Sequence, residues 1–208
     1  MPNWCTTDIV MVGTKENVNN LYDDLRRQQA VSRKGTTEDR WSFLNQENWL
    51  GYVVQELLGK NWEEMDCRGT VESVDIPTSM EDGSGDWRIQ MLWVVAWCPC
   101  YQLQKELAAK YGLKLYFLAE EGGNLVYETN DADGYWFSER YKWKEEYFDS
   151  FEALAADFIT EYGGEVRDLE HLQERMQNEI TEEDEYGDCY NYIEICRLVN
   201  DDGEVIEE

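Results

Sequence analysis

Residues 87–97 read WRIQMLWVVAW, and this stretch decides the fold. Large apolar side chains occupy every second position from Trp87 to Trp97, which is the period of a β-strand. After Leu92 the intervening positions are apolar as well, so we expect a central strand that is covered on both faces. Pro99 follows this strand and suits the first turn of a helix, which we expect to end at Gly112.

The segments on either side of this strand show the same two periods. The first strand places Trp4, Thr6 and Asp8 on one face, and Thr14 can cap the helix that follows it. A second helix, with apolar residues at helical spacing, is expected to stop at Gly59. In chain order, we expect strand 4–12, helix 15–29, helix 46–58, strand 64–76, strand 87–97, helix 99–112 and strand 113–119.

This order is β-α-β-β-α-β, with one additional helix before the second strand. It predicts an α+β protein with a ferredoxin-like, split βαβ antiparallel sheet and helices on one face. The other face of such a sheet needs a cover. An uncovered face would allow the protein to form a homodimer.

The second part of the chain predicts an extension of this sheet. Residues 125–129 and 135–143 resemble a β-hairpin, and helices are expected at 150–162 and from 168 onward. A last strand is expected at 188–199, before an acidic tail. We therefore divide the chain into a ferredoxin-like domain, residues 1–145, and an acidic helical extension, residues 146–208, which we expect to pack on the same domain.

Negative charge is concentrated in the second half. The net charge is -27, and residues 120–208 hold 28 Asp and Glu against 6 Lys and Arg. Such a surface repels phosphate backbones and anionic lipids, so we expect no direct nucleic-acid or membrane partner. It favours a protein partner with a basic surface, although the same charge could serve solubility alone.

The sequence indicates a cytoplasmic protein. Its beginning shows no signal peptide, and its longest apolar run, Met91–Cys98, is too short to cross a bilayer. The six cysteines are scattered along the chain, so we expect reduced thiols.

Several motifs resemble a known family. Met1-Pro2-Asn3-Trp4-Cys5 opens a strand, Trp62 follows Gly59-Lys60-Asn61, Trp97-Cys98-Pro99 joins a strand to a helix, and the strand 113–121 closes on two acidic residues. Over residues 1–145 these features resemble the YubB-type ferredoxin-like family of phage, plasmid and bacterial accessory proteins. Cys98 stands where that family usually has serine. The resemblance implies the fold and a mobile-element context, but no catalytic residues.

The residues needed for common catalytic chemistry are sparse. His171 is the single histidine, so a metal centre with two or three histidines cannot form within one chain. A calcium loop that used Gly134 as its sixth residue would place Arg140 at its twelfth, where glutamate is required. Glu120 and Glu121 could meet Glu63 or Asp66 and perform acid–base or metal chemistry, but nothing in their spacing demands it.

We therefore expect a protein without catalytic residues, cofactor or metal. Its function would be to bind a protein partner, as an accessory protein of a mobile element or bacterium. Two alternatives remain open: a nucleic-acid mimic that inhibits a host defence or DNA-processing protein, and an enzyme with a carboxylate-bound divalent metal. The candidate binding surface consists of Trp4, Trp62, Trp97, Glu120 and Glu121.

Overall fold

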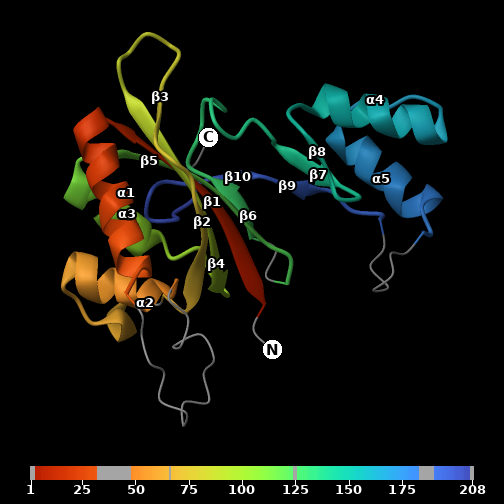
Figure 1. Ribbon diagram of the computed structural model, residues 1–208. Helices are drawn as coiled ribbons and strands as arrows, with labels where there is room; N and C mark the ends of the chain where they lie inside the picture. Colours follow the sequence, from red (N-terminus) through yellow and green to blue (C-terminus); the bar gives the residue numbers. More distant parts are fainter. Residues whose placement is uncertain (1–2, 32–47, 66, 124–125, 183–189, 207–208) are drawn as a thin grey trace. The chain divides into compact units, whose positions relative to one another are not determined.

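A computed structural model describes residues 3–31, 48–65, 67–123, 126–182 and 190–206. The chain forms two compact units (Figure 1). Unit 1 consists of residues 1–131 and 198–208, and unit 2 consists of residues 132–197. Helices and strands occur in both, so the chain is an α+β protein, as the sequence predicted.

A seven-stranded sheet forms the centre of unit 1, with the order β10-β6-β5-β1-β4-β2 and with β3 paired to β4. Strand β1 is the centre of this sheet, because it pairs antiparallel with both β4 and β5. The strands are β1 (Trp4–Gly13), β2 (Gly69–Val74), β3 (Thr78–Ser79), β4 (Trp87–Ala96), β5 (Lys114–Glu121), β6 (Val126–Thr129) and β10 (Arg197–Leu198).

The helices of unit 1 lie together on one side of this sheet (Figure 1). They bury one set of alternate strand residues, including Cys5, Ile9 and Met11 of β1 and Trp93 of β4, in one apolar core. Such burial is the main favourable contribution to folding. The helical segments are α1 (Lys15–Gln29), α2 (Leu50–Tyr52), the π-helix η2 (Val53–Leu58), the 3-10 helix η3 (Trp62–Glu64) and α3 (Tyr101–Tyr111).

The helix ends follow the expected capping rules. The Thr14 hydroxyl accepts a hydrogen bond from the Asn17 amide at 3.2 Å and caps α1. Gly59 and Gly112 adopt the left-handed conformation directly after η2 and α3. The sequence therefore predicted the first helix and the positions where the other two end.

Two expected elements of unit 1 differ from the structure. The strand expected at 64–76 begins only at Gly69. Before it the chain forms the 3-10 turn η3, which Asn61 caps by accepting a hydrogen bond from the Glu63 amide. The helix expected at 46–58 contains the π-helix η2, and its first two expected residues lie outside the described residues.

Unit 2 has a core of its own. A three-stranded sheet, β8-β7-β9, packs with two helices around Trp143, Leu154, Phe158, Leu172 and Met176 (Figure 1). The Ser150 and Asp168 side chains accept backbone hydrogen bonds and cap the two helices. The elements are β7 (Tyr141–Trp143), β8 (Glu146–Phe148), α4 (Phe151–Tyr162), α5 (Leu169–Glu179) and β9 (Glu194–Ile195).

The expected hairpin between residues 125–129 and 135–143 is wrong. Strand β6 pairs with β5, whereas β7 pairs with β8 through the two-residue turn at Lys144 and Glu145. The single strand expected at 188–199 is replaced by the short strands β9 and β10, on either side of Cys196, and residues 188–189 lie outside the described residues.

The compact units differ from the division at residue 145. The β7–β8 hairpin belongs with α4 and α5, and the chain returns to unit 1 at Leu198. There the Val199 amide donates to the Thr129 carbonyl at 2.9 Å, and the Asn130 side chain donates to Asp201 at 2.7 Å. Within the described residues, no helix combines the length and the apolar character needed to cross a membrane.

Candidate binding face

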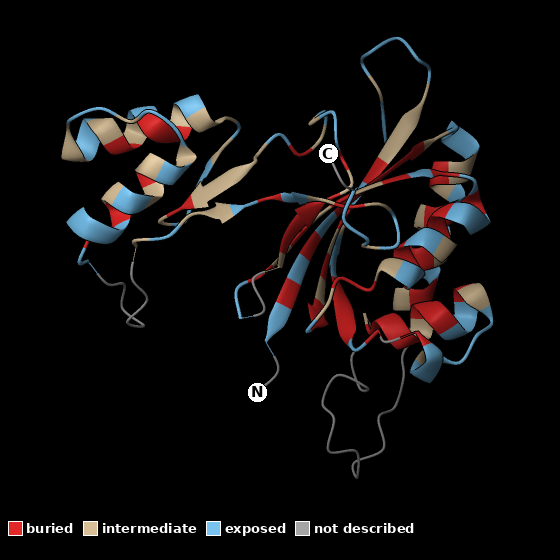
Figure 2. Cartoon of the chain, turned by 180° about the vertical axis from the view of Figure 1, so that it is seen from behind, coloured by how far each residue is buried: buried red, intermediate tan, exposed pale blue. Residues whose placement is uncertain are grey.

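One side of the unit 1 sheet presents side chains that point away from its helices. Along β1, Cys5 and Thr7 are buried, while Trp4, Thr6 and Asp8 are exposed. Exposed and buried bands alternate over the first half of the strand nearest the N label in Figure 2, whereas Val10 and Val12, farther along the same face, are buried. Trp4 is 50% exposed.

Strand register places an apolar floor around Asp8. Asp8 stands opposite Leu92 of β4 and Leu118 of β5, and Thr6 stands opposite Val94 and Glu120. Leu92, Val94, Leu118 and Glu120 are all half-buried. We call this surface the Asp8 face, and it comprises Trp4, Thr6, Asp8, Leu92, Val94, Leu118 and Glu120.

The pKa of Asp8 reflects its surroundings on this face. Desolvation is the main cause that raises the pKa of Asp8, and the negative charge of Glu120 adds to it. Leu92 and Leu118 are the neighbours of Asp8 in the two adjacent strands. The cations carried by the three central strands, Arg88 and Lys114, both stand opposite Val12, about 13 Å along β1 from Asp8. The Asp8 face therefore places two carboxylates beside apolar side chains.

Trp97 lies at the same end of the sheet as Trp4. Its amide donates to the Asn3 carbonyl at 3.0 Å, and Trp4 pairs with Ala96, the residue before Trp97. Trp97 is 42% exposed and has a φ of 76°, a conformation that non-glycine residues rarely adopt. Strained residues of this kind often occur at functional sites, so the β4–α3 connection adds a second exposed indole there.

The structure does not bring all five residues of the expected surface together. Trp4, Trp97 and Glu120 lie at one end of the sheet, but Glu121 is buried, with its Oε1 atom accepting from the Gly123 amide at 2.8 Å. Trp62 packs against the helix-side core, and its ring centroid lies 5.0 Å from that of Trp49.

The expected contact of Glu120 with Glu63 or Asp66 is also not seen in the described residues. Asp66 lies outside the described residues, and Glu63 belongs to η3. Glu120 instead acts on Asp8, whose pKa it helps to raise and which was absent from the expected site. The signal for Asp8 was available, because strand alternation places it on the face of Trp4.

Cys5 occupies the opposite, buried side of β1. Burial raises the pKa of its thiol to about 12, and the charges of Glu121 and Glu128 contribute in the same direction. The hydrogen bond with the Thr7 hydroxyl lowers this pKa, by less than burial raises it but by more than these charges do. Such a thiol is not a nucleophile at neutral pH.

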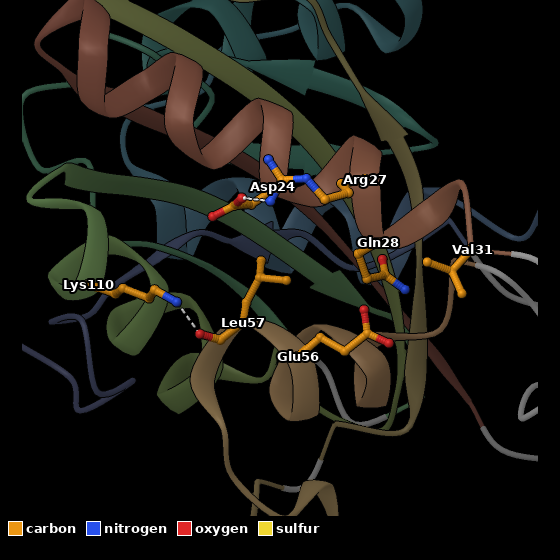
Figure 3. A pocket seen from close by; sticks show the side chains of 7 residues that line it. All are labelled: Asp24, Arg27, Gln28, Val31, Glu56, Leu57 and Lys110. Atoms are coloured by element: carbon orange, nitrogen blue, oxygen red, sulfur yellow. Dashed lines mark hydrogen bonds and ion pairs between the residues drawn. The ribbon is translucent and has the colours of Figure 1, made fainter.

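A second candidate is a hollow between α1 and η2 (Figure 3). It has a volume of about 310 Å³, and Lys110 of α3 reaches its edge. Its lining residues are Asp24, Arg27, Gln28, Val31, Glu56, Leu57 and Lys110.

The charges of this hollow are largely used within the protein. Asp24 pairs with Arg27 at 2.7 Å and accepts a hydrogen bond from the Tyr111 hydroxyl at 2.7 Å. The Lys110 ammonium donates to the Leu57 carbonyl, which the π-helix leaves available. Because both signs of charge are present and paired, the hollow selects a ligand less clearly than the Asp8 face does.

Metal chemistry receives no support from the described part of the chain, where no group of three or more His, Cys, Asp or Glu side chains is placed to hold an ion. Comparisons of the sequence with protein-family models and with curated proteins, and of the fold with solved structures, give no match.

Proposed function

We propose that this protein is a non-catalytic binding protein that holds a basic, partly apolar segment of a partner protein on the Asp8 face. The observation that carries this proposal is the placement of Asp8 and Glu120 beside the exposed Trp4 indole. A partner's Lys or Arg would relieve the repulsion between the two carboxylates. Its apolar side chains would cover Leu92, Leu118 and Trp4.

The charge of unit 2 supports a basic partner. Residues 132–197 hold 19 Asp and Glu against 6 Lys and Arg. Lys144 and Arg175 are paired with glutamates, and Arg140 donates to backbone carbonyls. Since acidic residues outnumber basic ones by 13 in this unit, it presents a negative field, which speeds the encounter with a basic protein.

The fold and its setting form a further part of the proposal. The strand order β5-β1-β4-β2, with α1 and α3 as the crossovers, supports a ferredoxin-like arrangement. A YubB-type accessory protein acting in the cytoplasm would fit this arrangement. The described cysteines, Cys5, Cys67, Cys98, Cys100 and Cys196, are free thiols, which is consistent with a reducing compartment.

The test is a binding measurement with a model peptide. The probe is an extended peptide of alternating Arg and Leu, with Glu-Leu and Ser-Leu peptides as charge controls. The double variant Asp8→Asn/Glu120→Gln should bind the Arg-Leu peptide about tenfold more weakly than the wild type, as expected for the loss of about 1.4 kcal/mol. Trp4→Ala should weaken binding by a similar factor.

The matched control removes the same charge elsewhere. Glu16→Gln/Asp23→Asn changes two exposed carboxylates of α1, on the helix side of the same sheet (Figure 1), and should alter the affinity less than twofold, because exposed charges beyond about 10 Å are screened. An equal loss in both double variants would show that the Asp8 face is not the binding surface.

A nucleic-acid mimic is the second candidate, and the acidic surface of unit 2 is the observation that favours it. A mimic would bind through carboxylates spread over the surface. Both double variants would then weaken binding to a basic DNA-binding protein, and duplex DNA would compete for that protein. The Asp8-face proposal predicts that duplex DNA does not displace the Arg-Leu peptide from the protein. Binding of the peptide to the DNA itself would reduce the free peptide, so it is measured separately.

A further inference from the structure

The Lys144 ammonium lies inside a group of aromatic rings in unit 2. Its Nζ atom is 4.8 Å from the ring centroid of Trp143, 5.3 Å from that of Tyr162 and 5.7 Å from that of Tyr190. Each distance is within the range in which an aromatic ring attracts a cation. Three separate segments, β7, α4 and the stretch before β9, therefore supply rings to one ammonium position.

Oxygen acceptors complete this position. The Lys144 Nζ atom donates to Glu161 Oε1 at 2.7 Å, to the Tyr162 hydroxyl at 3.1 Å and to Glu182 Oε2 at 3.3 Å. We call this site the ammonium cage, and it consists of Trp143, Glu161, Tyr162, Glu182 and Tyr190. Three acceptors match the three N–H donors of a primary ammonium, which a trimethylated amine lacks.

The cage walls are held by contacts that do not involve Lys144. Trp143 is buried, and its indole Nε1–H donates to the Tyr190 carbonyl at 2.8 Å. Tyr162 stacks on Phe158 with a centroid distance of 4.9 Å, and the Tyr190 amide donates to the Glu182 carbonyl at 3.3 Å. The rings of Trp143 and Tyr162 are therefore held by contacts that do not involve the lysine between them.

The occupant is carried by a strained turn. Lys144 has a φ of 51° and Glu145 a φ of 64°, so the β7–β8 turn requires two consecutive left-handed residues. Asn and Gly are the residues that such a turn favours, because a bulkier side chain costs free energy there. The chain thus places a lysine where the backbone alone would favour glycine.

Burial by itself would lower the pKa of Lys144, but the hydrogen bonds to Glu161, Tyr162 and Glu182 raise it above the ordinary value. The site therefore favours the charged form of an amine. The Glu161 and Glu182 side chains are 44% and 59% exposed, so two of the three acceptors also face solvent.

We propose that the ammonium cage is a binding site for a lysine side chain of a partner protein, and that Lys144 closes it from within. A tethered lysine acts at an effective concentration in the millimolar range or above, so a dilute free amine does not displace it. A partner's lysine that docking holds near the cage has a comparable effective concentration and makes the same contacts, so it can compete with Lys144 for the site. This inference concerns unit 2 and does not rest on the function proposed for the Asp8 face.

The experiment opens the cage with Lys144→Gly, which also suits the left-handed turn. The probe is n-butylammonium, which reproduces the end of a lysine side chain, and n-butanol is its uncharged control. We expect n-butylammonium to shift the NMR signal of the Trp143 indole N–H saturably in Lys144→Gly, while the wild type and the n-butanol samples do not change. Adding Glu161→Gln should weaken this binding about tenfold.

The same variants test closure by Lys144. A lysine-rich peptide should bind Lys144→Gly at least tenfold more tightly than the wild type, and its Nε-acetylated form should bind neither. Equal affinity of both proteins for the peptide would overturn the closure, and a folded Lys144→Gly that ignores n-butylammonium would overturn the site. If Lys144→Gly leaves unit 2 unfolded, n-butylammonium should restore its structure, and failure of this rescue would also overturn the proposal.

Discussion

At the scale of single residues, Asp8 shows most clearly how local surroundings determine behaviour. It stands between two leucines and near a second carboxylate, so the folded state holds its ionised form at a cost. The strand period predicted that Asp8 and Trp4 share a face. It could not predict the leucines on either side, because these come from two other strands whose register is set by the whole sheet.

The first prediction concerns Asp8→Asn. The pKa of Asp8 is raised from its ordinary value of 3.8, so the folded state binds this proton more tightly than the unfolded state. Stability is therefore lost as the pH rises from about 4 through the folded pKa, and the full cost is present at pH 7. We expect the variant to raise the free energy of unfolding at pH 7 by about 0.5 kcal/mol, discounted for the exposure of the group.

Urea unfolding at several pH values measures this effect. The stabilisation by Asp8→Asn should shrink as the pH falls towards 4, where the wild-type carboxyl is protonated. Asp82→Asn is a control of opposite sign, because the hydrogen bonds from the Ser84 hydroxyl and amide lower the pKa of Asp82. A variant Asp8→Asn that is less stable than the wild type at pH 7 would contradict the explanation.

At the scale of elements, the helices were more predictable than the strand pairings. Helical spacing and capping residues identified α1, α3, α4 and α5, since both signals lie within a dozen neighbouring residues. The expected hairpin failed because β6 pairs with β5, a partner that the local pattern of residues 126–143 does not reveal. The π-helix η2 also lacked a signal, because its apolar residues fit a 3.6-residue period equally well.

The same distinction applies to the candidate site. Glu120 and Glu121 are adjacent in β5, so a strand must place them on opposite faces, and only Glu120 reaches the Asp8 face. The placement of Trp97 depends on a positive φ, which the neighbouring residues in the sequence did not predict. Trp62 was assigned to the expected surface from its motif, but it begins the 3-10 turn η3 and packs against the helix-side core.

Gly69 gives the prediction at this scale. A Cβ atom there would lie 2.3 Å from the Val94 carbonyl oxygen and 2.7 Å from the Val95 Cα atom, both in the backbone of β4. Gly69→Ala must therefore move β2 away from β4, and we expect it to lower the free energy of unfolding by about 1–3 kcal/mol. Chemical denaturation measures the change.

Gly122→Ala is the matched control for Gly69→Ala. A Cβ atom at Gly122 would meet nothing within 4 Å, so this substitution should change stability by less than about 0.5 kcal/mol. If both variants lose the same stability, close approach of β2 to β4 is not the reason for glycine at position 69.

At the scale of the whole molecule, the chain contains two separate apolar cores, one in each unit. The sequence indicated enough apolar residues for both, but it gave no composition change at residues 132 and 198. The division at residue 145 followed the start of the acidic helices. The structure instead groups residues by the core that they bury, and the β7–β8 hairpin shares the core of α4 and α5.

The third prediction is that the two cores can be destabilised separately. Phe158 is fully buried in unit 2, so Phe158→Ala should cost unit 2 about 3–5 kcal/mol. Leu21 is fully buried in unit 1, so Leu21→Ala should cost that unit about 2–5 kcal/mol. Amide hydrogen exchange can assign each loss to the strands and helices concerned.

In Phe158→Ala, protection should fall in β7, α4 and α5 and remain in β1, β4 and β5. Leu21→Ala should show the reverse pattern. A loss of protection throughout the chain in both variants would mean that the two units unfold as one cooperative body.

The return of residues 198–206 to unit 1 has a consequence for synthesis. Thr129 and Val199 are hydrogen-bonded partners, yet 69 residues lie between them in the chain. A ribosome delivers residues in order, so unit 2 is complete before the last strand of the unit 1 sheet emerges. Unit 1 must wait with the outer edge of β6 open, and an open strand edge is where nascent chains associate wrongly. If unit 2 folds early, the segment between Thr129 and Val199 is a compact body and no longer a long, flexible loop. The entropy cost of bringing the two residues together is then smaller, and they pair faster.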